Sequence, residues 1–167
     1  MTRGLIIVVT GVAGSGKTTV GRELAAQLGW PFFDADDFHS AANKKKMAHG
    51  VALTDDDRRG WLEALRSLIA ERSRAGSNAV VACSALKESY RKTLCVDPAV
   101  VKFVFLKGSL GLIKERLHNR KGHFFAERLL GDQVATLEEP ADAITVEIAD
   151  TPKKIVATLR GRLARLL

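Results

Sequence analysis

The eight residues from Gly11 to Thr18, GVAGSGKT, carry the most specific chemical signal in the sequence. They form a complete phosphate-binding loop of the G-x-x-x-x-G-K-[ST] type, in which glycines let the backbone curl and point several N–H groups at phosphate oxygens. The helix that follows adds its positive N-terminal end. We expect Lys17 to reach the β- and γ-phosphates of ATP and Thr18 to ligate Mg²⁺. The predicted nucleotide-binding residues are Gly11, Val12, Ala13, Gly14, Ser15, Gly16, Lys17, Thr18 and Thr19.

Two carboxylates, Asp34 and Asp36, follow the next apolar segment, residues 30–33. That segment indicates a short buried strand, and ligands of open α/β sheets bind at the carboxyl ends of strands. Alternation along an extended chain places Asp34 and Asp36 on one side and turns Asp37 away. Both carboxylates are therefore expected to face one cleft.

Cations and a histidine that could bind an anionic second substrate lie further along the chain. His39, Asn43 and Lys46 could share one side of a short helix, although spacing alone makes His39 more simply a helix-start residue in a loop. Lys87 and Arg91 follow a third strand, residues 78–83, and are four positions apart. That pair fits either a site for one anion or a solvated helix face.

The segment after a fourth strand, residues 100–106, resembles a closing lid in its composition. Arg116 and Arg120 are four positions apart at a helix end, Gly122 offers a hinge, and aromatic residues at 124 and 125 could exclude water. Kinases need such a part because phosphoryl transfer from ATP must be screened from water. A fifth strand, residues 143–148, ends at Asp150, Thr151 and Pro152, and a strand end beside the phosphate loop is a common adenine site.

The remaining patterns describe the elements that must position these groups. Apolar runs suited to a parallel sheet alternate with helical patterns at residues 19–28, 54–74 and 153–166. Thr54 and Asp57 predict a capping box, so the acidic run 55–57 is interpreted as structural. The histidines show no zinc spacing. The pattern predicts one α/β domain.

Composition narrows the class of protein. The 167 residues suffice for one full core, and 46% hydrophobic with 27% charged residues is typical of a globular cytoplasmic protein. The first apolar run, residues 5–9, is too short for a signal peptide or membrane span. Cys83 and Cys95 are expected to be small buried hydrophobes in a reducing compartment.

The net charge of +7 could indicate nucleic-acid binding. The only compact basic run is Lys44-Lys45-Lys46, without interleaved aromatics or a recognisable nucleic-acid module. A kinase for an anionic substrate must also gather cations. We therefore expect neither a nucleic-acid partner nor a membrane.

With these pieces in place, nearly the whole chain resembles the gluconate kinase (gluconokinase) family of small P-loop kinases. The chain departs from the usual family pattern at Ser40, Ala52 and Gly60, changes that loosen turns rather than remove polar groups. The segments that carry the resemblance are residues 34–39 (DADDFH), Asn43, Lys46, Met47 and Gly50, residues 53–58 (LTDDDR) with Trp61 and Leu62, residues 83–87 (CSALK) with Tyr90 and Arg91, and residues 120–124 (RKGHF) with Leu129, Leu130, Gln133, Leu137, Glu138 and Pro140.

The resemblance implies an α/β P-loop NTPase fold of the nucleoside-monophosphate-kinase and shikimate-kinase type, with a five-stranded parallel sheet, helices on both faces and a helical lid. It implies a single kinase domain, residues 1–167, with an acceptor-binding segment at about 36–62 and a lid at about 116–137. The implied activity is phosphorylation of D-gluconate to 6-phosphogluconate, with ATP and Mg²⁺ as cofactors. The family is typically dimeric, which implies a homodimer.

The resemblance also implies a role for each candidate residue. The catalytic residues are Lys17, Asp36 as the base for the 6-hydroxyl, and Arg120, which would neutralise charge on the transferring group. Asp34 would act on Mg²⁺ through metal-bound water, beside Thr18. The gluconate site comprises Asp36, His39, Arg58, Lys87, Arg91 and His123, and the nucleotide site adds Arg116, Asp150 and Pro152 to the loop.

Two other functions share part of this pattern. A shikimate-type or nucleotide kinase has the same loop, paired aspartates and lid, but segments 36–39 and 121–124 argue against it. A nucleotide-dependent nucleic-acid-binding or regulatory protein without turnover is compatible with the basic charge.

Overall fold

The computed structural model describes residues 2–119 and 123–167, with the side chains of 123–127 excepted. Within this part of the chain, five strands form one parallel sheet of order β2-β3-β1-β4-β5. The strands are β1 (Ile6–Thr10), β2 (Phe32–Asp34), β3 (Ala79–Ala82), β4 (Val101–Lys107) and β5 (Ile144–Glu147). The predicted five-stranded parallel sheet is confirmed.

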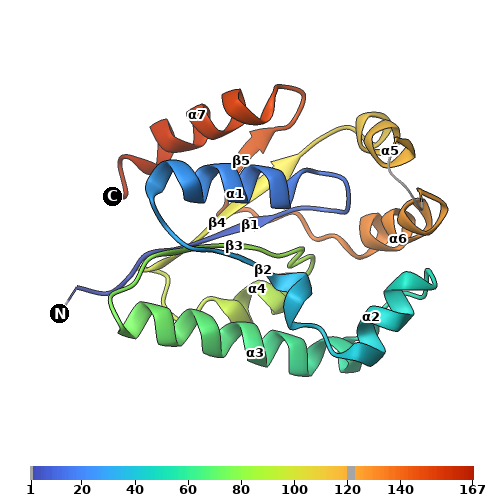
Figure 1. Ribbon diagram of the computed structural model, residues 1–167, viewed down its shortest axis with the longest axis horizontal. Helices are drawn as coiled ribbons and strands as arrows, with labels where there is room; N and C mark the ends of the chain where they lie inside the picture. The colour runs from blue at the N-terminus through green and yellow to red at the C-terminus, as the bar shows by residue number, and fades with distance from the viewer. Residues whose placement is uncertain (1, 120–122) are drawn as a thin grey trace.

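The helices cover both faces of this sheet (Figure 1). They are α1 (Lys17–Leu28), the 3₁₀ helix η1 (Ala35–Phe38), α2 (Ala41–Ala48), α3 (Asp55–Arg74), α4 (Glu88–Leu94), α5 (Leu110–His118), α6 (His123–Thr136) and α7 (Pro152–Leu163). Helices α1 and α7 lie on one side of the sheet, and α3 and α4 lie on the other (Figure 1). The elements α2, α5 and α6 gather at the end of the molecule where the strands terminate.

Strand β1 shows why the sheet needs both layers. Its five residues are all buried, and successive side chains of a strand point to opposite faces. Ile7 and Val9 join the core beneath α1 and α7, while Ile6 and Val8 join the core against α3. A central parallel strand must therefore be continuously apolar, as the sequence pattern predicts. This strand carries the phosphate loop directly from its end.

The predicted capping box is confirmed. Thr54 Oγ1 accepts from the Asp57 N–H at 3.1 Å, and the Asp57 carboxylate accepts from the Thr54 N–H at 2.9 Å. Together these bonds satisfy two donors that the start of α3 would otherwise leave without partners. Helix α1 ends at Gly29, whose φ of 69° is the left-handed conformation that favours glycine.

The chain after β2 departs from the predicted geometry. Strand β2 is a short, half-buried edge strand, and the backbone turns directly into η1 instead of remaining extended. Asp37 therefore does not turn away as alternation predicts, but lines the same cleft as Asp34 and Asp36. His39 caps the end of η1 rather than joining α2, which begins after Ser40. The Ser40 hydroxyl accepts from the Asn43 N–H at 3.1 Å and so replaces the proline of the family pattern with a helix cap.

Candidate active site

The phosphate loop has the backbone conformation that its glycines permit. Gly11, Gly14 and Gly16 have φ values of 152°, 79° and 94°, a region that other residues rarely adopt. A Cβ atom on Gly14 would lie 2.8 Å from Leu117 Cγ, so the lack of a side chain there is also a packing requirement. Helix α1 starts at Lys17 without a side-chain cap, which leaves its first N–H groups for an anion. The loop thus fits the phosphates of a nucleotide.

Oxygen ligands for a divalent cation lie at the end of the loop. Thr18 Oγ1 donates to Asp34 Oδ2 at 2.9 Å, and Asp34 Oδ1 accepts from the Asp36 N–H at 3.0 Å. Asp34 therefore bridges the phosphate loop and η1. The Thr18 hydroxyl and the Asp34 carboxylate are hard oxygen donors of the kind that Mg²⁺ prefers, so the residues present fit the predicted ion.

Asp36 has the electrostatic character of a general base. Burial raises the pKa of its carboxyl group, the negative charge of Asp34 raises it further, and Lys17 opposes both effects. A carboxylate with a raised pKa accepts a proton more readily than an ordinary aspartate. Asp36 lines the same cleft as Lys17 and Thr18, so a proton acceptor lies beside the phosphate loop.

His39 is fixed and neutral in the wall of this cleft. Its ring stacks on Trp61 with a centroid distance of 4.2 Å, and its Nδ1 lies 3.4 Å from Asn43 Nδ2. Burial, together with the charges of Arg58 and Lys44, lowers the pKa of His39 to about 4. Because an amide nitrogen can only donate, Nδ1 is the acceptor and Nε2 carries the hydrogen. His39 can therefore offer a neutral donor to a hydroxyl group.

Arg58 lines the cleft from the first turn of α3 and is held by Tyr90. Its Nη1 donates to the Tyr90 hydroxyl at 2.9 Å, and its guanidinium lies 5.5 Å from the centre of that ring. The Tyr90 hydroxyl in turn donates to Asp55. Lys87 Nζ also donates to Asp55, at 3.1 Å. Lys87 is not among the described residues that line the cleft. Of these two predicted ligands, the structure brings Arg58 but not Lys87 to the cleft.

Arg91 is buried and hydrogen-bonds to the main chain. Its guanidinium donates to the carbonyls of Ala85 at 2.8 Å, Leu86 at 3.1 Å and Glu138 at 2.7 Å. Ala85 has a φ of 39°, an unfavourable conformation for a residue with a side chain. The turn that Arg91 holds follows Ser84, which lines the cleft. The structure therefore places Arg91 behind the site and not among its lining residues.

Two hollows meet at the phosphate loop. The larger, of about 700 Å³, extends from Ala13, Lys17 and Thr18 across to Asp36, His39 and Arg58. The smaller, of about 380 Å³, lies on the other side of the loop and is lined by the three residues that the resemblance adds to the nucleotide site, Arg116, Asp150 and Pro152. Arg116 Nη2 donates to the Ile148 carbonyl at 2.5 Å. The phosphate loop thus contributes to the walls of both hollows.

Some predicted residues fall outside the structural description. Arg120 and the hinge at Gly122 are not among the described residues, and the side chain of His123 is also excluded.

Cys83 is described and buried, and burial raises the pKa of its thiol to about 12. A thiol that stays protonated is inert, which agrees with its predicted role as a small hydrophobe.

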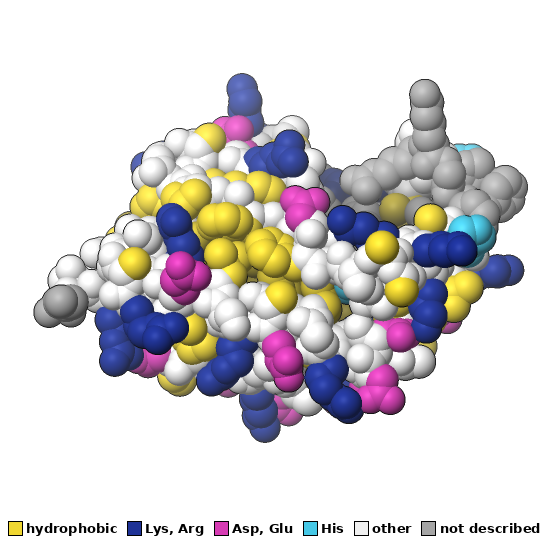
Figure 2. Space-filling model, turned by 60° about the horizontal axis from the view of Figure 1, so that its bottom comes forward, with side chains coloured by type: hydrophobic (Ala, Val, Ile, Leu, Met, Phe, Trp, Pro, Cys, Tyr) yellow, Lys and Arg dark blue, Asp and Glu magenta, His cyan; other side chains and the backbone are white. Residues whose placement is uncertain are grey.

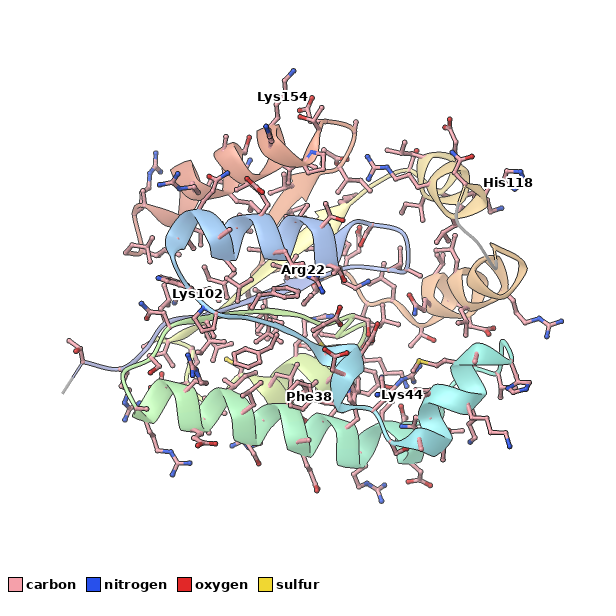
Figure 3. The ribbon with its side chains drawn as sticks, in the orientation of Figure 1. Arg22, Phe38, Lys44, Lys102, His118 and Lys154 are labelled. Atoms are coloured by element: carbon pink, nitrogen blue, oxygen red, sulfur yellow. The ribbon has the colours of Figure 1, made fainter. Side chains whose placement is uncertain are left out.

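The structure adds cleft residues that sequence reasoning missed. Lys44, labelled in Figure 3 on α2, lines the cleft, although the sequence offered it only as one of three consecutive lysines. Its neighbour Lys46 pairs with Asp57 instead, with Nζ 2.8 Å from Oδ2. Gln133 of α6 also lines the cleft, and its only sequence signal is its place in the family resemblance.

On the face shown in Figure 2, Lys and Arg side chains are interspersed with Asp and Glu, without one continuous basic patch.

Comparisons with known proteins agree with this arrangement. A family model described as shikimate kinase matches residues 13–158. The gluconokinase of Gluconobacter oxydans is 47% identical over 136 residues, covering 81% of this chain and 76% of that protein. The thermoresistant gluconokinase of Escherichia coli is 41% identical over 157 residues, covering 92% of this chain and 90% of that protein.

The solved structures include a gluconokinase from Sinorhizobium meliloti. It matches with a TM-score of 0.87 and 42% identity, covering 99% of this chain and 95% of that chain. The likeness therefore extends over both hollows and over the helices around them. In the part of the chain that the structure describes, no helix is long and apolar enough to cross a membrane.

Proposed function

The chain belongs to the gluconokinase family of small P-loop kinases, and on that premise we propose that it transfers the γ-phosphoryl group of ATP to the 6-hydroxyl of D-gluconate. The observation that carries this proposal is the single cleft in which the phosphate loop faces Asp36, His39 and Arg58. A nucleotide on the loop and a polar anion beside Arg58 would meet at Asp36.

Phosphoryl transfer of this kind depends on positioning and on charge stabilisation. The loop amides and Lys17 would hold the β- and γ-phosphates. Thr18 would hold Mg²⁺ with Asp34 acting through bound water, and the ion would neutralise phosphate charge. Asp36 would accept the proton of the 6-hydroxyl as the new O–P bond forms and the bond to the β-phosphate oxygen breaks, leaving ADP.

Recognition of gluconate requires a cation for its carboxylate and neutral groups for its hydroxyls. Arg58 has a planar guanidinium suited to a carboxylate, and its contact with Tyr90 fixes its orientation. His39, which is neutral above its lowered pKa, offers Nε2–H to a hydroxyl. Lys44 adds a further cation to the cleft, beside Lys17 and Arg58. We assign the carboxylate to Arg58 rather than Arg91, because the Arg91 guanidinium is engaged by three carbonyls.

Several finer assignments belong to the same proposal. Residues 36–62 form the acceptor-binding segment and residues 116–137 form the lid, where Arg120 neutralises the transferring group and His123 contacts gluconate. Lys87 contacts gluconate only if it leaves Asp55. We further propose that the enzyme requires Mg²⁺, acts in the cytoplasm and forms a homodimer.

A coupled assay of ADP release tests the substrate. The acceptors are gluconate, glucose, shikimate and a panel of nucleoside monophosphates, with ATP and Mg²⁺ present. Glucose is the matched control because it has the same chain length but no carboxylate. We expect rapid turnover of gluconate and poor turnover of glucose. Equal rates on these two would remove the argument from Arg58, and preferential turnover of shikimate would favour the broader family named by the model of residues 13–158.

A further inference from the structure

Helix α6 contacts the phosphate loop directly through Gln133. Gln133 Oε1 accepts a hydrogen bond from the Ala13 N–H at 2.6 Å, across a separation of 120 residues. Leu129, Asp132, Gln133 and Thr136 line the cleft at helical spacing, so one face of α6 forms its wall. A side chain of α6 thus holds a main-chain donor of the loop.

The Ala13 contact fixes which end of the Gln133 amide faces the cleft. A backbone N–H can only donate, so the atom facing it must be the amide oxygen. Among the described residues, none accepts a hydrogen bond from the amide nitrogen. Gln133 is part-buried in the cleft wall. Its two N–H donors are therefore available to a ligand in the cleft.

Ala13 marks the acceptor side of the phosphate loop. Ala13 lines the larger cleft together with Asp36 and Arg58. The smaller hollow, on the nucleotide side, is lined by loop residues that follow Ala13, and Ala13 is not among the described residues that line it. The phosphoryl group that is transferred must lie between nucleotide and acceptor. The Gln133 amide, which contacts Ala13, would consequently lie beside the terminal phosphate of a bound nucleotide.

The chain just after α6 is anchored at Glu138, five residues beyond Gln133. The Glu138 N–H donates to the Leu86 carbonyl at 2.8 Å, and the Glu138 carbonyl accepts from Arg91. A Glu138 carboxylate oxygen accepts from the Glu88 N–H at 2.9 Å. Side chains placed on anchored elements orient ligands better than those on loose loops.

We propose that Gln133 is a binding residue for the terminal phosphate of ATP. Its oxygen docks α6 on the Ala13 N–H, and its nitrogen donates to a γ-phosphate oxygen, so Gln133 distinguishes ATP from ADP. The inference rests on the proposed binding of ATP at the loop, but it requires neither gluconate nor turnover. A neutral amide suits this place because a carboxylate there would repel the phosphate.

Calorimetric titration with ADP and with a non-hydrolysable ATP analogue, each with Mg²⁺, tests the inference. The variants are Gln133→Met, which removes both hydrogen bonds, and Gln133→Glu, which keeps an acceptor for Ala13 but replaces the donor by a charge. Val134→Glu is the matched control, because it adds the same charge at the adjacent, exposed position of α6. Thermal unfolding of each variant checks its fold.

We expect the Kd of the ATP analogue to rise about tenfold or more in Gln133→Met and further in Gln133→Glu, because a hydrogen bond to a charged group is lost. The Kd of ADP should change less than about twofold in both, and the control should match the wild type. Equal weakening of both nucleotides, or no weakening of either, would overturn the inference. Failure of the wild-type protein to bind either nucleotide would instead refute the proposed function. If one variant does not fold, the other still decides the comparison.

Discussion

The nucleotide half of the site, formed by residues 11–19 and the hollow beside them, differs in construction from the acceptor half, formed by η1, α2, α3 and α4 with its N-cap Lys87. The nucleotide half depends on consecutive residues whose backbone conformation does the binding, such as the positive φ values of Gly14 and Gly16. The acceptor half depends on side chains from separate elements. A contiguous motif therefore predicts the first, whereas only tertiary packing assembles the second.

The cations of the acceptor half show what this difference implies. Four of them are plausible ligands by charge, yet Lys46 pairs with Asp57, Lys87 with Asp55, and Arg91 with main-chain carbonyls. Only Arg58 among these four lines the cleft. Three of the four cations are therefore engaged by ion pairs or by hydrogen bonds to carbonyls. A count of charges alone would have assigned these three cations to the substrate.

The largest effect should come from the nucleotide half. Lys17→Met removes the ammonium that stabilises charge on the β- and γ-phosphates, and we expect kcat to fall by several orders of magnitude. Circular dichroism should show an unchanged fold, because the hydrogen bond that the variant loses, from Lys17 Nζ to the Val12 carbonyl at 3.0 Å, is local to the loop. Turnover within tenfold of the wild type in a folded variant would contradict the assignment of this loop.

The next largest effect concerns the junction between the two halves. Asp36→Asn keeps the size of the side chain but removes the proton acceptor, so kcat should fall about 10²- to 10⁴-fold with little change in ATP affinity. Asp34→Asn should instead raise the Mg²⁺ concentration that is required, because Asp34 contacts Thr18. Steady-state kinetics over a Mg²⁺ series separate the two outcomes. The opposite pattern would exchange the two roles.

The wild-type pH profile sharpens this assignment. Burial and the Asp34 charge raise the pKa of Asp36, and a base works only when ionised. Activity should therefore be lost as pH falls through a pKa above that of an ordinary aspartate. An acid limb at or below the usual aspartate range would contradict Asp36 as the base.

The sequence predicts the fold well, and the phosphate loop has the backbone conformation that its glycines predict. A parallel sheet buried on both faces requires continuous apolar strands, and the central strands β1 and β3 show that pattern. The acceptor half was predicted less well because local patterns do not report tertiary partners. Asp37 faces the cleft because β2 ends in a 3₁₀ turn, and Arg91 lies behind it because the Ala85 turn needs its donors. Gln133 contacts a residue 120 positions away, which no local spacing reveals.

A comparison of Arg58→Ala with Arg91→Ala tests whether a cation of the acceptor half binds substrate or supports structure. Loss of a charge-assisted contact costs about 1.5 to 3 kcal/mol, so Arg58→Ala should lower kcat/KM for gluconate about ten- to a hundredfold and glucose turnover much less. Arg91→Ala should lower Tm, because three carbonyls lose their donor, and should affect both sugars alike. The ratio of gluconate to glucose kcat/KM is the measurement. A selective loss of gluconate turnover in Arg91→Ala would restore Arg91 to the substrate site.

The smallest effect should come from His39 and should appear in stability rather than in rate. Burial and the charges of Arg58 and Lys44 lower the pKa of His39 from 6.5 to about 4. The unfolded state therefore binds a proton between these pH values while the folded state does not, so stability falls as pH falls below 6.5. Between pH 7.5 and pH 5.5 this proton should cost about 1 kcal/mol of unfolding free energy.

His39→Gln provides the control for this pH dependence, since its amide does not titrate and can still hydrogen-bond. Urea unfolding of both proteins at pH 7.5 and pH 5.5 cancels the contributions of the other titrating groups. The wild type should lose about 1 kcal/mol more than the variant on acidification. Equal losses would mean that His39 is protonated as readily in the folded protein as in the unfolded chain. The acceptor half would then present a cation at that position, and the neutral donor proposed for a gluconate hydroxyl would have to be sought elsewhere in the cleft.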